Sequence, residues 1–209
     1  MLSEAGNIEV QNRQRVFVNA GCGVPGQGRL PPLFDSWRQI RVDVDSRVAP
    51  DIVADITDLS VIESGSVDAI WSAHCLEHLY IHQVDPALAE FHRILKEDGF
   101  ACIIVPDLQT ISQYIVSDRL HEVIYESQAG PVTAHDVLFG FGPAVARGST
   151  SMAHRCGFTP TAMLNRLRQG SFVEVVLRRR PSLELAALAL KKASSHAAAR
   201  EALLTDLAL

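Results

Sequence analysis

The chain has 209 residues, of which 47% are hydrophobic, and a formal net charge of −5 at pH 7. This length suits one domain with a buried core and a short appendage. The acidic balance argues against a nucleic-acid partner, because such surfaces carry clustered Lys and Arg. No apolar run approaches the ~18 residues that cross a bilayer, and the first residues lack a signal-peptide core. We therefore expect a soluble, cytoplasmic protein that does not bind membranes.

The first half of the chain has the pattern of an α/β sheet, in which β-rich segments alternate with turn or helix signals. We expect strands at residues 15–20, 39–44, 51–54, 67–72 and 100–105. The connection at 45–50 is too short for a crossover helix. Further on, Asp85 should cap a helix that holds Pro86 in its first turn and ends at Gly99.

The second half is less regular. Residues 107–157 contain Gly, Pro, His and aromatic residues around one expected helix at 108–126, which suggests a lid or substrate region. Thr159 should cap a helix that runs from near Pro160 to Gln169.

The last segments predict a sheet edge and a tail. Residues 172–180 and 183–192 predict an antiparallel pair of strands, although the Ala and Leu content of the second also suits a helix. We thus expect one domain at 1–192 and a helical tail at 193–209. The tail is expected to be a docked or frayed terminal helix, and the alternative is a dimerisation helix. A monomer and a homodimer both remain open. The widely spaced cysteines show no CxxC pair and are expected to be reduced.

A glycine-rich turn follows the first strand. Gly21 and Gly23 allow the backbone to turn sharply and to approach a ligand closely. With Gly26 and the later Asp43, the segment spells the dinucleotide fingerprint GxGxxG plus an acid. However, a pyrophosphate site needs a helix directly after the turn, and the prolines and glycines of VPGQGRLPPLF would break one. S-adenosylmethionine has no phosphate and is therefore favoured over NAD.

Five segments occur in the order and spacing of known motifs: VFVNAGCG, RVDVD, DIVADITDL, SVDAIWSAHCLEHL and EFHRILKEDGFACIIVPD. In these segments the chain resembles the class I S-adenosylmethionine-dependent methyltransferases, most closely the small bacterial, type 11-like group with LEHL after the fourth strand. The resemblance covers roughly residues 15–107. It implies a Rossmann-like α/β sheet, mostly parallel with a C-terminal antiparallel strand pair and a shortened connection between strands 2 and 3. It also implies S-adenosylmethionine as cofactor and a small-molecule or saccharide-type acceptor.

The resemblance further implies a set of cofactor contacts. Gly21 and Gly23 would pack against the methionine and ribose portions, and Asp43 would accept hydrogen bonds from both ribose hydroxyls. Asp55 would lie near the adenine amino group, although a turn cap explains it almost as well. The full expected set is Asn19, Ala20, Gly21, Cys22, Gly23, Asp43, Val44, Asp55, Ile56, Ala73 and His74. Asn19 stands where the family often has an acid, so its contact would be neutral or water-mediated.

Catalysis is less well defined by the sequence. Methyl transfer needs mainly alignment, and a general base helps when the acceptor is a hydroxyl. The candidates for this base are His74, His78, His135 and His154. His74 to His78 also spell HxxEH, an inverted zinc-protease motif that requires both histidines on one helix face. Since the motif directly follows a strand, we expect no metal there. The remaining alternatives are a non-catalytic nucleoside-binding module, an NAD-dependent oxidoreductase and a zinc hydrolase.

Overall fold

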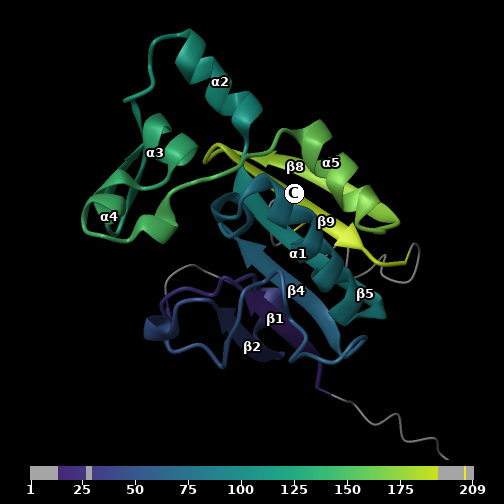
Figure 1. Ribbon diagram of the computed structural model, residues 1–209. Coiled ribbons are helices and arrows are strands. Elements are labelled where there is room, and N and C mark those ends of the chain that lie inside the picture. Colours follow the sequence, from purple (N-terminus) through teal and green to yellow (C-terminus); the bar gives the residue numbers. More distant parts are fainter. Residues whose placement is uncertain (1–13, 27–29, 193–204, 206–209) are drawn as a thin grey trace, which may run out of the picture.

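Among the residues that the computed structural model describes, 14–26, 30–192 and 205, seven strands form one sheet in the order β3-β2-β1-β4-β5-β9-β8 (Figure 1). Neighbouring strands are parallel from β3 to β5, whereas β9 is antiparallel to both β5 and β8. This confirms the predicted mostly parallel sheet with a C-terminal antiparallel pair. The strands are β1 (Val16–Ala20), β2 (Arg38–Asp43), β3 (Ile52–Val53), β4 (Val67–Ala73), β5 (Leu95–Pro106), β8 (Glu174–Arg180) and β9 (Glu184–Leu190).

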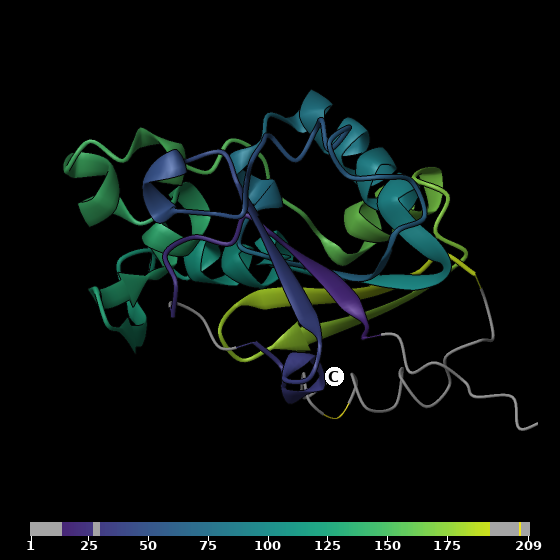
Figure 2. The same cartoon turned by 90° about the horizontal axis from the view of Figure 1, so that it is seen from below.

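Two helices, α1 (Ile81–Ile94) and α5 (Pro160–Gln169), lie on one face of this sheet (Figure 2). Val84, Leu88 and Phe91 recur at three- and four-residue spacing on α1 and are fully buried. They join strand residues in the largest apolar cluster of the described chain. Burial of this helix stripe therefore fixes α1 against the strands that carry the site.

The opposite face carries a short 3-10 helix, η1 (Pro32–Phe34), between β1 and β2. Phe34 stacks on Phe17 of β1 with ring centroids 4.2 Å apart, and the edge of Trp37 meets Phe34 at 5.4 Å. Proline at the start of η1 and the glycines before it disfavour a longer helix. As expected from the sequence, the described residues after the glycine turn form no long helix.

The short connection between β2 and β3 is also confirmed. It contains the 3-10 helix η2 (Ser46–Val48), where the Asp45 side chain accepts a hydrogen bond of 2.9 Å from the backbone of Arg47. β3 has only two residues, fewer than the expected 51–54.

The expected boundaries of the first helix were wrong. α1 begins at Ile81, so Asp85 does not cap it and Pro86 lies inside the helix. Instead, the Gln83 side chain accepts a hydrogen bond of 2.9 Å from the backbone of Tyr80, just before the helix. The helix also ends before Gly99, because Leu95 already pairs with β4 across a register shift.

The expected helix at 108–126 forms only in the first half of that range. α2 (Leu108–Val116) ends before Asp118, whose φ of 55° is left-handed. The remainder forms a hairpin of β6 (Val123–Ser127) and β7 (Gly130–Thr133). Val123, Ile124 and Tyr125 suit a strand better than a helix, because branched and aromatic side chains pack well on a pleated surface.

The irregular region forms a small unit of its own. After the hairpin come α3 (Ala134–Phe139), α4 (Gly142–Ala146) and the 3-10 helix η4 (Thr150–Met152), and Figure 1 shows α2, α3 and α4 gathered apart from the sheet. Ile111, Val132 and Val137 pack with Leu183, which lies in the turn between β8 and β9. This small apolar cluster anchors the unit to the end of the sheet.

The predicted tail lies outside the described residues, except for Thr205. All four cysteines are free thiols. Within the described part of the chain, no helix combines the length and hydrophobicity that crossing a membrane requires.

The predicted cap of α5 is present and can be tested. The Thr159 side chain accepts a hydrogen bond of 3.3 Å from the backbone of Ala162. Thr159→Ala is therefore expected to lower the free energy of unfolding by ~1 kcal/mol, measured by urea denaturation. Thr161→Ala, which changes an exposed threonine in the same helix, should alter it by less than ~0.5 kcal/mol. Equal losses in both variants would contradict the capping role.

Candidate active site

The glycine turn at the end of β1 is tightly built. Gly21 has a φ of 69°, and its backbone N donates to the carbonyl of Val42 in β2 at 2.9 Å. A Cβ at Gly21 would lie 2.8 Å from the Cβ of Cys75 and would also collide with its sulfur. Gly23 has a φ of 58°, but a Cβ there would meet no atom within 4 Å. Glycine at position 21 thus provides space, and at both positions it avoids the strain that a side chain brings to a left-handed backbone.

Asp43, at the end of β2, holds this turn. One of its carboxylate oxygens accepts a hydrogen bond of 2.9 Å from the backbone of Gly23, and the other accepts one of 2.9 Å from Asp45. Each carboxylate oxygen has two lone pairs, so both retain acceptor capacity for a ligand hydroxyl.

Arg41 forms a second brace, which the sequence did not suggest. Its guanidinium donates to the carbonyl of Gly23 at 2.8 Å, to Ala49 at 2.7 Å and to Val48 at 3.1 Å. The turn is therefore tied to the connection between β2 and β3 before any ligand arrives.

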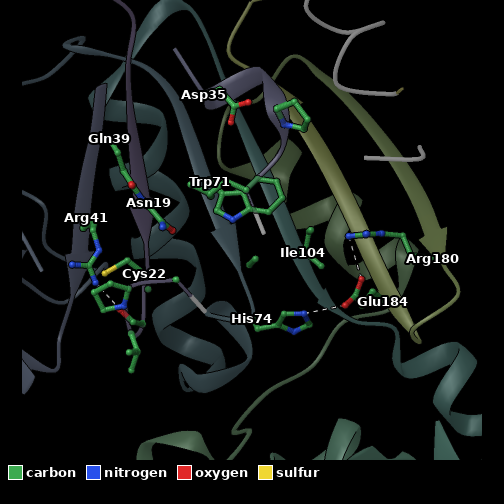
Figure 3. A pocket seen from close by; sticks show the side chains of 18 residues that line it. Asn19, Cys22, Asp35, Gln39, Arg41, Trp71, His74, Ile104, Arg180 and Glu184 are labelled. Atoms are coloured by element: carbon green, nitrogen blue, oxygen red, sulfur yellow. Dashed lines mark hydrogen bonds and ion pairs between the residues drawn. The ribbon is translucent and has the colours of Figure 1, made fainter. Parts of the chain in front are cut away.

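A cavity of about 880 Å³ opens beside the glycine turn (Figure 3). It extends from the turn across β4 and β5 to the start of β9. Its walls include Asn19, Gly21, Cys22, Gly23, Asp35, Gln39, Arg41, Trp71, Ala73, His74, Ile104, Arg180 and Glu184. This volume falls in the range of ligand pockets, and the mixture of apolar and polar walls suits an amphipathic ligand.

His74 bridges two carboxylates at one end of this cavity, and Figure 3 shows its contact with one of them, Glu184. Its Nδ1 lies 3.2 Å from Glu77 Oε1, and its Nε2 lies 3.1 Å from Glu184 Oε1. Burial opposes protonation, but the hydrogen bonds and charges of Glu184 and Glu77 outweigh it and raise the pKa of His74 to about 10. With both ring nitrogens engaged and the proton held, His74 is a charged bridge that is poorly suited to act as a base at neutral pH.

A second, smaller cavity of about 250 Å³ lies on the other side of this bridge. His74 and Glu184 line both cavities, and the small unit contributes Tyr125, Asp136 and His154 to the second. Its position beside the larger cavity gives a two-chamber site with His74 at the junction.

The structure brings most of the expected cofactor residues together. Asp43 holds the glycine turn through its hydrogen bond to Gly23. Six of the expected residues line the large cavity: Asn19, Gly21, Cys22, Gly23, Ala73 and His74. Ala20 is buried at the end of β1, whereas the Val44 side chain is exposed.

The remaining expected residues are more scattered. Asp55 accepts hydrogen bonds from the backbone and hydroxyl of Thr57, a local turn, and Ile56 is buried. Neither lines the two cavities. Among the candidate bases, His78 and His154 line the small cavity together with His74. His135 is not among these lining residues and instead contacts the rings of His121 and Phe139.

Sequence reasoning missed three charged residues of the site: Arg41, Glu77 and Glu184. Glu77 belongs to the LEHL segment, but only its spacing from two histidines drew attention to it. Glu184 and Arg41 lie on strands of ordinary composition, so no local signal could have found them.

The inverted zinc-protease geometry is not formed. The segment contains only the 3-10 helix η3 (Leu76–His78), and His74 precedes it with a left-handed φ of 52°. Since both nitrogens of His74 already face carboxylates, it cannot act as a metal ligand in this arrangement.

Part of the chain matches a known protein family. Residues 20–103 match a family described as "Methyltransferase domain". These residues include the glycine turn, Asp43 and His74. Less than half of the chain is therefore similar to a methyltransferase domain.

A curated relative supports this methyltransferase domain over a short segment. The malonyl-[acyl-carrier protein] O-methyltransferase of Laribacter hongkongensis is 37% identical over 73 residues, which are 35% of this chain. The matched segment spans only 20% of that relative's length.

Solved structures share the fold of the methyltransferase domain over most of the chain. One of them is a 1,6-didemethyltoxoflavin-N1-methyltransferase from Burkholderia thailandensis, solved with bound 1,6-didemethyltoxoflavin and S-adenosylhomocysteine. Its TM-score is 0.50 and its sequence identity is 19%, and the match covers 86% of this chain and 72% of that chain. A SAM-dependent methyltransferase from Archaeoglobus fulgidus has a TM-score of 0.55 and 13% identity, with coverages of 86% and 87%. The PH0226 protein of Pyrococcus horikoshii has a TM-score of 0.59 and 12% identity, with coverages of 88% and 84%.

Proposed function

We propose that this chain transfers the methyl group of S-adenosylmethionine to a small-molecule acceptor. The observation that carries this proposal is the pair of adjoining cavities. The large one borders the glycine turn of the methyltransferase domain, and the small one meets it at His74 and Glu184. A cofactor in the first could therefore present its methyl group to an acceptor in the second.

The residues present suit the cofactor. The turn at Gly21 exposes backbone without side-chain obstruction, and Asp43 retains lone pairs for the ribose hydroxyls. Asp35 adds a carboxylate to the wall of the large cavity, whereas Glu184 is paired there with His74 and Arg180. NAD fits less well, because the described residues after the turn form only the short 3-10 helix η1 and no α-helix whose N-terminus could hold a pyrophosphate.

The protein's main chemical task would be alignment. Methyl transfer is an in-line displacement at an activated carbon, and correct positioning alone can lower such a barrier by several kcal/mol. No covalent nucleophile is needed, and the one cysteine in the wall of the large cavity would be a weak one. Burial, opposed by Arg41, raises the pKa of Cys22, which keeps it as a thiol.

Calorimetric titration tests the cofactor half of this proposal. S-adenosylmethionine and S-adenosylhomocysteine should both bind with dissociation constants in the micromolar range, and NAD should give no binding heat. Binding of NAD alone, or of none of the three, would contradict the proposal.

A turnover assay tests the second half of the proposal, the transfer of the methyl group to an acceptor. The chain should release S-adenosylhomocysteine when incubated with S-adenosylmethionine and a library of small hydroxyl, amine and saccharide acceptors. Cofactor binding without release across the library would favour a non-catalytic binding module. Size-exclusion chromatography would show whether the active form is a monomer or a homodimer.

A further inference from the structure

Three metal-ligating side chains converge beside the small cavity. Glu77 and His78 come from η3, and His154 comes from the segment between η4 and α5. One donor atom of each lies within 4.8 Å of the others. The rings of His78 and His154 meet edge to face with centroids 4.9 Å apart. Both histidines line the small cavity, whereas Glu77 is buried against them.

Glu77 carries an unsatisfied charge-bearing atom. Its side chain is 1% exposed, and Oε1 is engaged by His74, but Oε2 has no hydrogen-bond partner within the described part of the chain. A buried polar atom without a partner costs about 1–3 kcal/mol, and a charged one costs more. Native proteins rarely retain such an atom unless it has a ligand or a function.

The ring of His78 has a neighbour that metal-bound histidines commonly have. Its Nδ1 lies 3.3 Å from the carbonyl of Ala153, which leaves the other ring nitrogen to offer a lone pair. Metal-bound histidines characteristically donate their second nitrogen to a carbonyl or carboxylate, and metal-bound carboxylates are themselves hydrogen-bonded, as Glu77 is by His74.

Backbone contacts hold the two segments together without help from the histidine rings. The backbone nitrogens of Arg155 and Cys156 donate to the carbonyl of Glu77 at 2.8 and 3.2 Å, and the Arg155 guanidinium donates to the carbonyl of His78 at 2.9 Å. The cluster should therefore survive replacement of a single ligand.

From this arrangement we infer that Glu77, His78 and His154 bind a divalent transition-metal ion of the zinc class. Two imidazoles and one carboxylate suit such an ion better than Mg²⁺, which prefers oxygen ligands. Zinc bonds of ~2.1 Å require donor atoms about 3.4 Å apart. The donor atoms of the three side chains lie within 4.8 Å of one another, so they must approach by up to about 1.4 Å on binding. The set differs from the inverted protease motif, because His74 supports Glu77 and does not ligate.

The metal would leave at least one coordination position facing the small cavity. An acceptor oxygen or nitrogen bound there would be fixed beside His74, at the junction with the cofactor cavity. This role, unlike the metal site itself, rests on the proposed methyl transfer. Direct metal binding therefore tests the site separately.

The test uses the full chain after removal of metals with a chelator. Titration with Zn²⁺ should show about one bound ion per chain, and the Co²⁺-loaded protein should show the visible absorption of a site of low coordination number. His78→Ala and His154→Ala should each weaken Zn²⁺ binding at least tenfold. His82→Ala, which removes an exposed histidine of α1, should bind as the unaltered chain does.

The results that would overturn the metal site are as specific as those that would support it. Absence of Zn²⁺ binding at micromolar concentration, or equal binding by the His154→Ala and His82→Ala variants, would overturn the site. Circular dichroism establishes that each variant is folded, and His154→Gln replaces His154→Ala if the latter is not. Titration of the metal-free chain with S-adenosylmethionine separates the two proposals, because zinc binding without cofactor binding would retain the metal site and contradict methyl transfer.

Discussion

Asp43→Ala is expected to weaken S-adenosylmethionine binding at least 100-fold. The variant loses the carboxylate that braces Gly23 and Asp45, together with the acceptor that the methyltransferase motif assigns to the ribose. Hydrogen bonds to a charged group are worth about 1.5–3 kcal/mol each, and each ~1.4 kcal/mol changes a dissociation constant tenfold. Two such bonds to the ribose therefore account for a loss of this size, measured by calorimetric titration.

Two control variants separate cofactor binding from loop stability. Asp45→Ala removes a partly exposed acid two residues later and should change the dissociation constant by less than about threefold. Asp43→Asn keeps one acceptor oxygen and should fall between Asp43→Ala and the unaltered chain. If Asp43→Ala binds the cofactor normally, Asp43 serves only the turn, and its assignment to the ribose is wrong.

Gly21→Ala is expected to damage both folding and cofactor binding. Alanine in a left-handed conformation costs about 1–2 kcal/mol, and the collision of its Cβ with Cys75 adds about 1–3 kcal/mol of overpacking. The free energy of unfolding should fall by roughly 3 kcal/mol in urea denaturation. Any relief of the collision displaces the turn, so S-adenosylmethionine binding should also fall at least 100-fold.

Gly23→Ala is the matched control, since it has a similar backbone conformation and open space for a Cβ. Its cost in stability should be limited to about 1–2 kcal/mol of backbone strain. The double variant Gly21→Ala/Cys75→Gly removes the colliding side chain and should recover part of the lost stability. Equal stability of the two alanine variants would show that the contact with Cys75 is not the cause.

Much of the fold could be predicted from local patterns. The glycine turn, the short connection after Asp43, the cap at Thr159 and the final strand pair were all confirmed, because each depends on residues that are close together in the sequence. The start of α1 was missed, since Pro86 is compatible with a first turn but does not require one. The second half of the expected helix at 108–126 was missed because strand propensity and pairing with β7 prevailed there.

In the candidate site, too, residues that are close together in the sequence could be predicted and residues that are far apart could not. Gly21, Gly23 and Asp43 were identified because a short apolar strand, a turn and an acid occur in a fixed order. The joining of His74 to Glu184 was not predictable, because these residues lie 110 positions apart and meet only when β9 inserts beside β5.

The sequence by itself thus determined the glycine turn at which we propose that the cofactor binds. Glycine tolerates the left-handed backbone of the turn after β1, and the motif has glycine at two positions of that turn, 21 and 23. Only the tertiary structure decided that Glu77, His78 and His154 share a cluster. His154 approaches through backbone bonds between η3 and a segment more than seventy residues away, and such contacts leave no periodic pattern in the chain.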